Sequence, residues 1–398
     1  MSDLSEPAKK ILKSVLALTI ASSSFAVQVF LPALPAVQKQ FGVSAAVVQL
    51  TVSLPLIALA VSTLMWGILS DRYGRRPTML AGLALFLIGT LACAVAPTIE
   101  LLIAGRLVQA VGGAACVVIS RAIVRDIYGR ERAAAELASL IAIMVIGPML
   151  APIIGGVLVD TVGWRGSFEF IAVFLAGVLA YAGFRLAETN HQRLPIPDLT
   201  GIFLAYGRLV RSSDFMAYAL QSAFMIGTFY VVLSAAPYAI ITVMGYSATE
   251  YGLGFILSTV GYLSGNLIAQ RYSQRVGIDR MIALALATAL ISTFATVALL
   301  MAGVWTLLAV FVPLTFMGIA NGMSLPNANA GAVSVYPEMA GTASGLLSFL
   351  QNGIAALFAQ VTGSVQDGTP HAFGLGMFVA AVLAVVSFYG PVRHKTLN

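Results

Sequence analysis

The sequence predicts an all-α membrane protein that crosses the bilayer twelve times. Of its 398 residues, 59% are hydrophobic and only 10% are charged, whereas soluble domains are about a quarter charged. A soluble fold has too little polar surface to cover so much apolar chain. The apolar residues lie in continuous runs of about 20, enough to cross roughly 30 Å of hydrocarbon. They do not alternate as the strands of a membrane barrel do.

Twelve apolar segments qualify as membrane spans. Each is expected to be helical, because a helix satisfies its own backbone hydrogen bonds in lipid. The first is long, lacks a small-residue cleavage site and is followed by further spans, so we expect a retained helix rather than a signal peptide. The ranges are 14–35, 46–69, 78–97, 99–120, 135–158, 165–185, 215–237, 249–270, 281–301, 304–325, 341–363 and 371–391.

Basic residues are distributed unevenly between the two sets of loops. If the N-terminus is cytoplasmic, nearly all loop arginines fall on the cytoplasmic side, and the opposite loops hold only Lys39 and Arg165. Basic residues mark cytoplasmic loops, so both termini are predicted in the cytoplasm. The net charge of +6 is then explained by these loops, and no nucleic-acid partner is expected.

The longest polar stretch, 186–213, divides the chain into halves of six spans. The predicted organisation is an N-terminal bundle (1–185), a central cytoplasmic loop (186–213) and a C-terminal bundle (214–398). A repeated R-Y-x-x-R pattern supports the division, because it follows the second span at Arg72 and the eighth span at Arg271. Two six-span repeats around a central pathway are typical of one large class of transporter.

The loop after the second span, residues 67–78, reads GILSDRYGRRPT. Glycine permits an unusual backbone angle in such a tight turn, and an ordinary basic cytoplasmic loop is the simplest alternative. The pattern resembles the G-x-x-x-D-x-x-G-R-R/K signature of the major facilitator superfamily. This resemblance implies the major facilitator fold and a latch between the halves on the cytoplasmic side, formed by Gly67, Asp71, Gly74, Arg75 and Arg76.

Two further segments are similar to signatures of the same family. Residues 105–113, GRLVQAVGG, resemble its fourth-span motif, and residues 147–156, GPMLAPIIGG, resemble the fifth-span motif of antiporters. Small residues spaced by four let another helix approach closely, and proline bends a helix. The motif is read either as a structural kink or as a seal that limits leak. Its residues are Gly147, Pro148, Pro152, Gly155 and Gly156.

The segments FLPALP, RAIVRDIYGRERAAAE, LSAAPYAI and YPEMAGTASG together resemble the bicyclomycin and chloramphenicol resistance branch of drug:proton antiporters. The resemblance implies a monomeric protein of the bacterial inner membrane that exports small amphipathic compounds in exchange for protons, by alternating access. Its partners would be a small-molecule substrate, protons and the lipid bilayer. A dedicated carrier for a sugar, amino acid or siderophore-like solute is the alternative, and a sensor that binds without transporting is a further one.

No enzyme, metal or cofactor is expected, because the sequence shows no nucleophile–base pair, metal cluster or phosphate-binding loop. The two cysteines, Cys93 and Cys116, both lie in apolar runs and suggest neither a disulfide framework nor a metal site.

Three polar residues within the predicted spans bear on proton coupling. Arg106 lies about seven residues into the fourth span, roughly 10 Å below the surface, so it should face a polar cavity unless its side chain extends outward. The resemblance places a coupling carboxylate just before L-P-x-L-P, but that position is Gln28, which cannot titrate. Glu169 lies at a similar depth, either as an ion-pair partner of Arg165 or as the proton carrier.

A substrate cavity is predicted from the polar and aromatic residues of these spans. Gln28 either contacts substrate or bridges two helices. Aromatic side chains suit an uncharged or weakly cationic amphiphile, and the seventh and tenth spans usually line the cavity in the family. The predicted lining residues are Phe25, Gln28, Phe30, Arg106, Tyr230 and Asn321, with Arg106 and Glu169 as the candidates for proton coupling.

Overall fold

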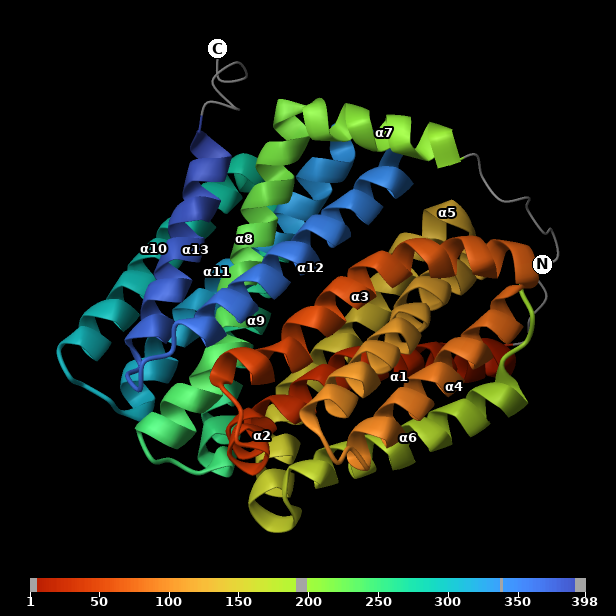
Figure 1. The fold of residues 1–398 in the computed structure, drawn as a ribbon. Helices are drawn as coiled ribbons and strands as arrows, with labels where there is room; N and C mark the ends of the chain where they lie inside the picture. Colours follow the sequence, from red (N-terminus) through yellow and green to blue (C-terminus); the bar gives the residue numbers. More distant parts are fainter. Residues whose placement is uncertain (1–5, 191–198, 337–338, 391–398) are drawn as a thin grey trace. The chain divides into compact units, whose positions relative to one another are not determined.

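The computed structural model describes residues 6–190, 199–336 and 339–390, apart from the side chains of residues 6–10, 125, 128–149, 199–203, 205 and 340. Regular structure in these ranges is helical throughout (Figure 1). Eleven helices in the described part are long and apolar enough to cross a membrane, and Leu150–Val162 is a shorter apolar helix. The predicted class, an all-α polytopic membrane protein, is therefore confirmed.

The chain divides into two compact units, the first formed by Met1–Gly42 and Leu50–Pro197. Its core lies between α1, α4, α5 and α6, with buried side chains such as Leu16, Phe86 and Leu175. The elements in chain order are α1 (Glu6–Phe30), a 3-10 turn (Leu31–Ala33), α2 (Leu34–Phe41), α3 (Ala45–Tyr73), α4 (Arg75–Ala94), α5 (Ile99–Val162) and α6 (Trp164–Arg185).

The second unit comprises Val43–Gln49 and Asp198–Asn398. Here α8 packs beside α12 and α13, while α11 packs beside α9 and α10 (Figure 1). The elements are α7 (Leu199–Arg211), α8 (Ser213–Pro237), a π-helical turn (Tyr238–Val243), α9 (Ala248–Val276), α10 (Ile278–Met301), α11 (Leu307–Ser334), α12 (Ala340–Ser364) and α13 (His371–Tyr389).

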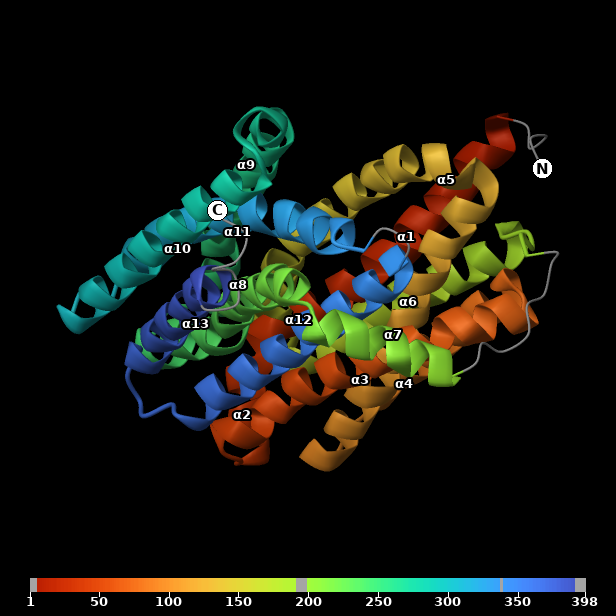
Figure 2. The same ribbon diagram turned by 90° about the horizontal axis from the view of Figure 1, so that it is seen from above.

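Helix α5 contains both the fourth and the fifth predicted spans. Its backbone is helical over 64 residues, but Gly113 and Gly155 both lie against α1, near Ser23 and Val29. A straight helix would separate these glycines by roughly 60 Å, so α5 must turn back on itself (Figure 2). The loop expected between the spans is helical instead, because residues 130–141, RERAAAELASLI, are mostly strong helix formers.

The stretch predicted as a central loop contains a helix, α7. Its apolar residues recur at helical spacing, including Tyr206 and Leu209, a pattern that favours an amphipathic helix. Leu209 is fully buried beside Phe215 and Leu347, which belong to α8 and α12. This part of 186–213 therefore packs on the second unit.

Candidate functional site

Arg106 is buried inside the first unit, with only 2% of its surface exposed. Its Nε atom donates to the carbonyl oxygen of Thr51 at 3.1 Å, and Nη1 donates to Gln109 Oε1. The guanidinium carbon lies 4.9 Å from the ring centroid of Phe30 and 6.0 Å from that of Phe168. Carbonyl and amide oxygens together with two aromatic faces can hold a cation away from water.

The contact that orients Arg106 depends on the close approach of α4 and α5. Gly89 of α4 lies so near α5 that a Cβ atom would be 2.3 Å from the backbone nitrogen of Gln109. This approach lets Gln109 Nε2 donate to Thr90 Oγ1 at 2.8 Å, while its Oε1 accepts from Arg106. The amide therefore links the guanidinium to α4 and fixes its position.

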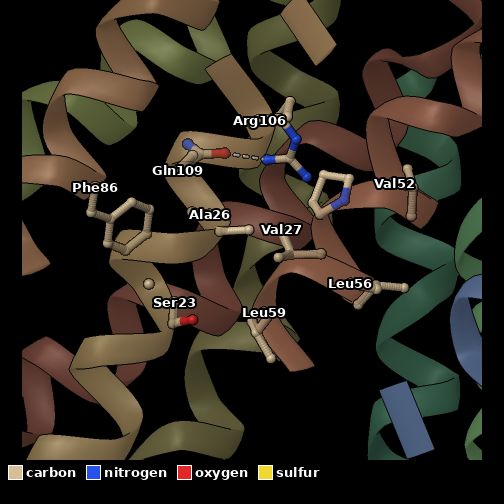
Figure 3. Close-up of a pocket in the computed structure, with 12 residues that line it drawn as sticks. Ser23, Ala26, Val27, Val52, Leu56, Leu59, Phe86, Arg106 and Gln109 are labelled. Carbon is tan, nitrogen blue, oxygen red and sulfur yellow. Dashed lines mark hydrogen bonds between the residues drawn. The ribbon is translucent and has the colours of Figure 1, made fainter. Parts of the chain in front are cut away.

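Arg106 and Gln109 border a cavity in the first unit, which we call the Arg106 pocket (Figure 3). Its volume is about 20 Å³, which is room for water rather than for a drug-sized ligand. The lining is largely apolar, with few polar groups. The lining residues come from α1, α3, α4 and α5, and they are Ser23, Ala26, Val27, Val52, Pro55, Leu56, Leu59, Phe86, Arg106, Gln109, Ala110 and Gly113.

The other predicted lining residues of α1 lie beside this pocket rather than on its wall. Phe25 packs against Phe170 and Phe174 of α6, with centroid distances of 6.1 and 6.0 Å. Phe30 is fully buried. Gln28 is 7% exposed, and its Oε1 atom is buried without a hydrogen-bond partner. Gln28 thus keeps an unused acceptor.

Glu169 lies on the exposed face of α6, next to the exposed Phe170. The hydrogen bond of Arg165 goes to the carbonyl oxygen of Ala96 at 2.8 Å, and its guanidinium stacks on the ring of Trp164. The preceding residue, Phe168, faces inward to Arg106. Because successive helical residues point about 100° apart, Glu169 and Phe168 face different surroundings.

In the second unit, Asn321 is buried on α11. Its Nδ2 donates to Thr228 Oγ1 of α8 at 3.4 Å, and its Oδ1 has no hydrogen-bond partner. Tyr230 of α8 is half-buried and packs edge-on against Phe229, with centroids 5.9 Å apart. Gln221 shares the α8–α11 interface, where its Nε2 donates to a serine hydroxyl. The interior of this unit thus offers uncharged polar groups.

The loop residues predicted as a latch form a charged cluster within the first unit, the Arg75 cluster, made of Asp71, Arg75, Asp126 and Glu188. Arg75 is 4% exposed. Its Nε donates to Asp126 Oδ2 at 2.8 Å and its Nη1 to Asp71 Oδ1. Gly67 lies on the same helix as Asp71, with ordinary packing. One guanidinium therefore joins the last turn of α3, the first turn of α4 and the middle of α5.

Glu188, just beyond α6, holds the start of α4. Its carboxylate accepts backbone N–H bonds from Arg75 at 2.8 Å and Arg76 at 3.1 Å, and from Thr189 and Asn190 as well. An anion at a helix N-terminus satisfies unpaired N–H groups and complements the helix dipole. Gly74 makes this possible, because its φ is +104° and a Cβ atom would meet the carboxylate.

Replacing Glu188 with glutamine is expected to lower the melting temperature more at neutral pH than at about pH 4. Desolvation raises the pKa of Glu188, but the four backbone N–H bonds outweigh it and hold the pKa below its usual value. The stabilisation is thus complete above the unfolded-state pKa and is lost as pH falls toward the lower folded-state pKa. Melting curves at both pH values measure this, with the exposed Glu100 changed to glutamine as control. An equal loss at both pH values would contradict it.

The antiporter-like motif is described only in part, because Gly147 and Pro148 belong to a stretch of α5 of which only the backbone is described. Gly155 lies directly against α1, where a Cβ atom would be 2.1 Å from the carbonyl oxygen of Val29. Pro152 and Gly156 are buried in the same C-terminal part of α5. The backbones of α1 and of the C-terminal part of α5 are therefore in direct contact.

The contacts of three participating residues were not predicted from the sequence. Gln109 could have been found, because it lies three positions after Arg106 and so shares its helix face. The sequence places Asp126 with Asp71 among the expected cytoplasmic latch residues, but its bond to Arg75 could not be predicted, because it spans 51 positions of sequence. Glu188 gives no signal of its own, since nothing in the linear sequence shows that the segment after α6 reaches the α3–α4 turn.

The amino-acid sequence is similar to those of several bacterial resistance proteins. The chain is 27% identical to the bicyclomycin resistance protein homolog of Haemophilus influenzae, covering 92% of each chain. It is 28% identical to multidrug resistance protein D of Escherichia coli, covering 94% of this chain and 93% of that one. It is 27% identical to a chloramphenicol resistance protein of Pseudomonas aeruginosa, covering 80% and 76%.

Among solved structures, the crystal structure of a D-xylose–proton symporter has a TM-score of 0.76 at 15% identity, covering 94% of this chain and 96% of the other. This likeness concerns the fold. The class of protein follows from the family model, which describes membrane transporters, together with the apolar helices long enough to cross a membrane. Residues 16–360 match the family model of the Major Facilitator Superfamily, and the chain belongs to that family. The expected likeness to its bicyclomycin and chloramphenicol resistance branch is confirmed.

Proposed function

We propose that this protein exports small amphipathic compounds across the bacterial inner membrane, in exchange for protons and by alternating access. The observation that carries the proposal is the match of residues 16–360 to the family model of the Major Facilitator Superfamily. In the first unit, the buried Arg106 borders a small and largely apolar cavity, and a charged residue buried within a membrane span is by default a candidate functional residue. The names of the relatives, which refer to multidrug, bicyclomycin and chloramphenicol resistance, support the same substrate class.

In the proposed cycle, residues 1–185 and 214–398 act as two halves of a monomer, joined by 186–213, with both termini in the cytoplasm. The Arg75 cluster keeps the end of α3, the start of α4 and the middle of α5 together as one rigid body. Rigid halves are what alternating access requires, since the transport step is a movement of one bundle against the other.

Proton exchange requires a carboxylate that can bind and release the coupling proton. Of the side chains that the structure describes, the charged ones that are buried are Arg75 and Arg106. Among the carboxylates that the structure describes, any that binds the coupling proton is therefore at least partly exposed. We propose Glu169 as the first candidate and the half-buried Asp126, beside Arg75, as the second.

Overproduction in a host that lacks its own exporters tests the export activity. We expect several-fold lower susceptibility to chloramphenicol and to at least one chemically unrelated amphiphile, because an apolar pocket discriminates weakly among apolar shapes. Protection against one compound alone would favour a dedicated carrier. Absence of protection, together with absence of labelled-substrate counterflow in vesicles, would reject transport and leave a sensor.

Proton exchange is tested in energised everted vesicles. Addition of substrate should dissipate the pH gradient, since each substrate entering the vesicle releases protons from it. Glu169→Gln should abolish this response if the proton binds there, and Asp126→Asn should abolish it if the second candidate is right. Transport without any proton movement in the unmodified protein would reject the exchange while leaving export in place.

A further inference from the structure

The hairpin formed by α9 and α10 carries its charges at its turn. Gly277 is the single residue between the two helices. Over residues 251–306 the charged residues are Arg271, Arg275, Asp279 and Arg280. The three arginines are exposed, and we call them the α9–α10 basic cluster. A membrane hairpin thus presents positive charge at one end and uncharged surface along the rest of its length.

The charge of this cluster is not balanced within the part of the chain that the structure describes. Asp279, the acid of the turn, accepts a hydrogen bond from the hydroxyl of Tyr218 on α8 at 2.7 Å. Among the described residues, none forms a salt bridge or a hydrogen bond with the side chains of the three arginines. Three arginines against one aspartate leave a net charge of +2, which is available to an anion.

The corresponding turn of the first half pairs its charges internally. When the two halves are aligned on the repeated R-Y-x-x-R pattern, Gln270 stands where the first half has Asp71. Gln274 likewise stands where it has the buried Arg75. The second half therefore keeps the exposed arginines of the pattern but lacks the ion pair beside them. Its positive charge faces outward, where a partner from outside the chain can reach it.

Exposed apolar side chains lead along both helices to the cluster. On α9, Leu267 is 64% exposed and lies four positions before Arg271. On α10, Leu284 is 53% exposed and lies four positions after Arg280, and the exposed Ile291 follows seven positions later. Residues at these spacings share one face of a helix. An amphiphile with an anionic head and apolar chains fits such a surface, with its head on the arginines and its chains along the leucines.

We propose that the α9–α10 basic cluster binds the headgroup of a phospholipid that carries two phosphates, as cardiolipin does. The net charge of +2 matches two phosphates, and guanidinium groups bind phosphate oxygens through paired hydrogen bonds. Basic sites beside membrane helices on the cytoplasmic side recognise such headgroups. Only the assignment to the inner leaflet rests on the proposed function, through its topology with both termini in the cytoplasm.

Lipid titrations of the full-length protein, purified in detergent, test the proposal. Native mass spectrometry measures the dissociation constants of cardiolipin, phosphatidylglycerol and phosphatidylethanolamine. We expect cardiolipin to bind at least about fivefold more tightly than phosphatidylglycerol, because its second phosphate adds an arginine contact and one such contact supplies about that factor. Phosphatidylethanolamine, which has no net charge, should bind more weakly than either.

Two double variants locate the site. Arg271→Gln combined with Arg280→Gln should weaken cardiolipin binding about twentyfold, since each arginine supplies about fivefold. Gln270→Glu combined with Gln274→Glu should weaken it to a similar extent, because it brings the turn to zero net charge while every arginine remains. This second variant keeps the test decisive if loss of basic residues disturbs membrane insertion, since acidic residues affect orientation little. Melting curves verify that each variant is folded.

The matched control is Arg72→Gln combined with Arg76→Gln, at the positions of the first half that correspond to Arg271 and Arg275. It removes the same number of charges and should change cardiolipin binding by less than about twofold, because the acids of the Arg75 cluster lie beside these arginines.

Equal weakening by this control would overturn the site, since the lipid would then respond to total charge alone. Equal affinity of the unmodified protein for phosphatidylglycerol would overturn it too, and so would unchanged cardiolipin binding in the folded cluster variants. Export of chloramphenicol is measured separately. Loss of the lipid site with export intact rejects this inference alone, whereas cardiolipin binding without any export rejects the proposed function alone.

Discussion

Replacing Arg75 with methionine is expected to lower the free energy of unfolding by about 2–4 kcal/mol and to abolish transport. The substitution leaves Asp71 and Asp126 facing each other without their shared cation. Both carboxylates retain some contact with water, because their side chains are 37% and 21% exposed. The expected loss of stability is therefore smaller than for a fully buried ion pair. Thermal and denaturant unfolding of the detergent-solubilised protein measures the change.

Arg76 is the matched control, because it is the next residue and has the same side chain. It is exposed, and its side chain makes one described hydrogen bond, to the carbonyl oxygen of Gly183 at 2.9 Å. Arg76→Met should change the stability by less than about 1 kcal/mol, as surface substitutions do. If both variants lost the same free energy of unfolding, the Arg75 cluster would not be the contact that holds α3, α4 and α5 together.

Replacing Gly155 with valine is expected to prevent normal folding. A Cβ atom at this position would lie 2.1 Å from the carbonyl oxygen of Val29, and neither backbone can move without separating α1 from α5. Overpacking costs about 1–3 kcal/mol where side chains can adjust, and a backbone clash leaves less room to adjust. Yield of monodisperse protein and melting temperature measure the effect.

Gly177 of α6 provides the control for this substitution. It is exposed, and a Cβ atom there would meet nothing within 4 Å. Gly177→Val should therefore be tolerated, since valine fits an apolar exposed helix position and even removes some unfolded-state entropy. A Gly155→Val protein as stable as Gly177→Val would mean that the described approach of α1 and α5 is not the one in the membrane.

The positions of the spans were predictable because each depends on local sequence. A run of about 20 apolar residues must form a helix in lipid, whatever its neighbours are. The same local reasoning missed α7, whose amphipathic spacing lies within a stretch that is polar on average. It also placed a loop between residues 120 and 135, where the backbone is helical.

The site was predictable only where a residue is unusual by itself. Arg106 could be singled out because an arginine deep in a span is costly and must be accommodated. Of its two described hydrogen-bond acceptors, Gln109 lies three positions later on the same helix face. Thr51 could not be assigned, because it lies 55 positions away and contributes a backbone oxygen. A carbonyl has no sequence signature at all.

The sequence by itself determined the helical membrane class, the family and the presence of one deeply placed arginine, since these depend on composition and short motifs. Only the tertiary structure decided what surrounds that arginine and where the acids lie. Glu169 shows the difference. Its depth in the membrane can be predicted from its position in the span, but the face of α6 on which it lies depends on how that helix packs. Helix rotation is set by long-range contacts, and it decides which residues can act together.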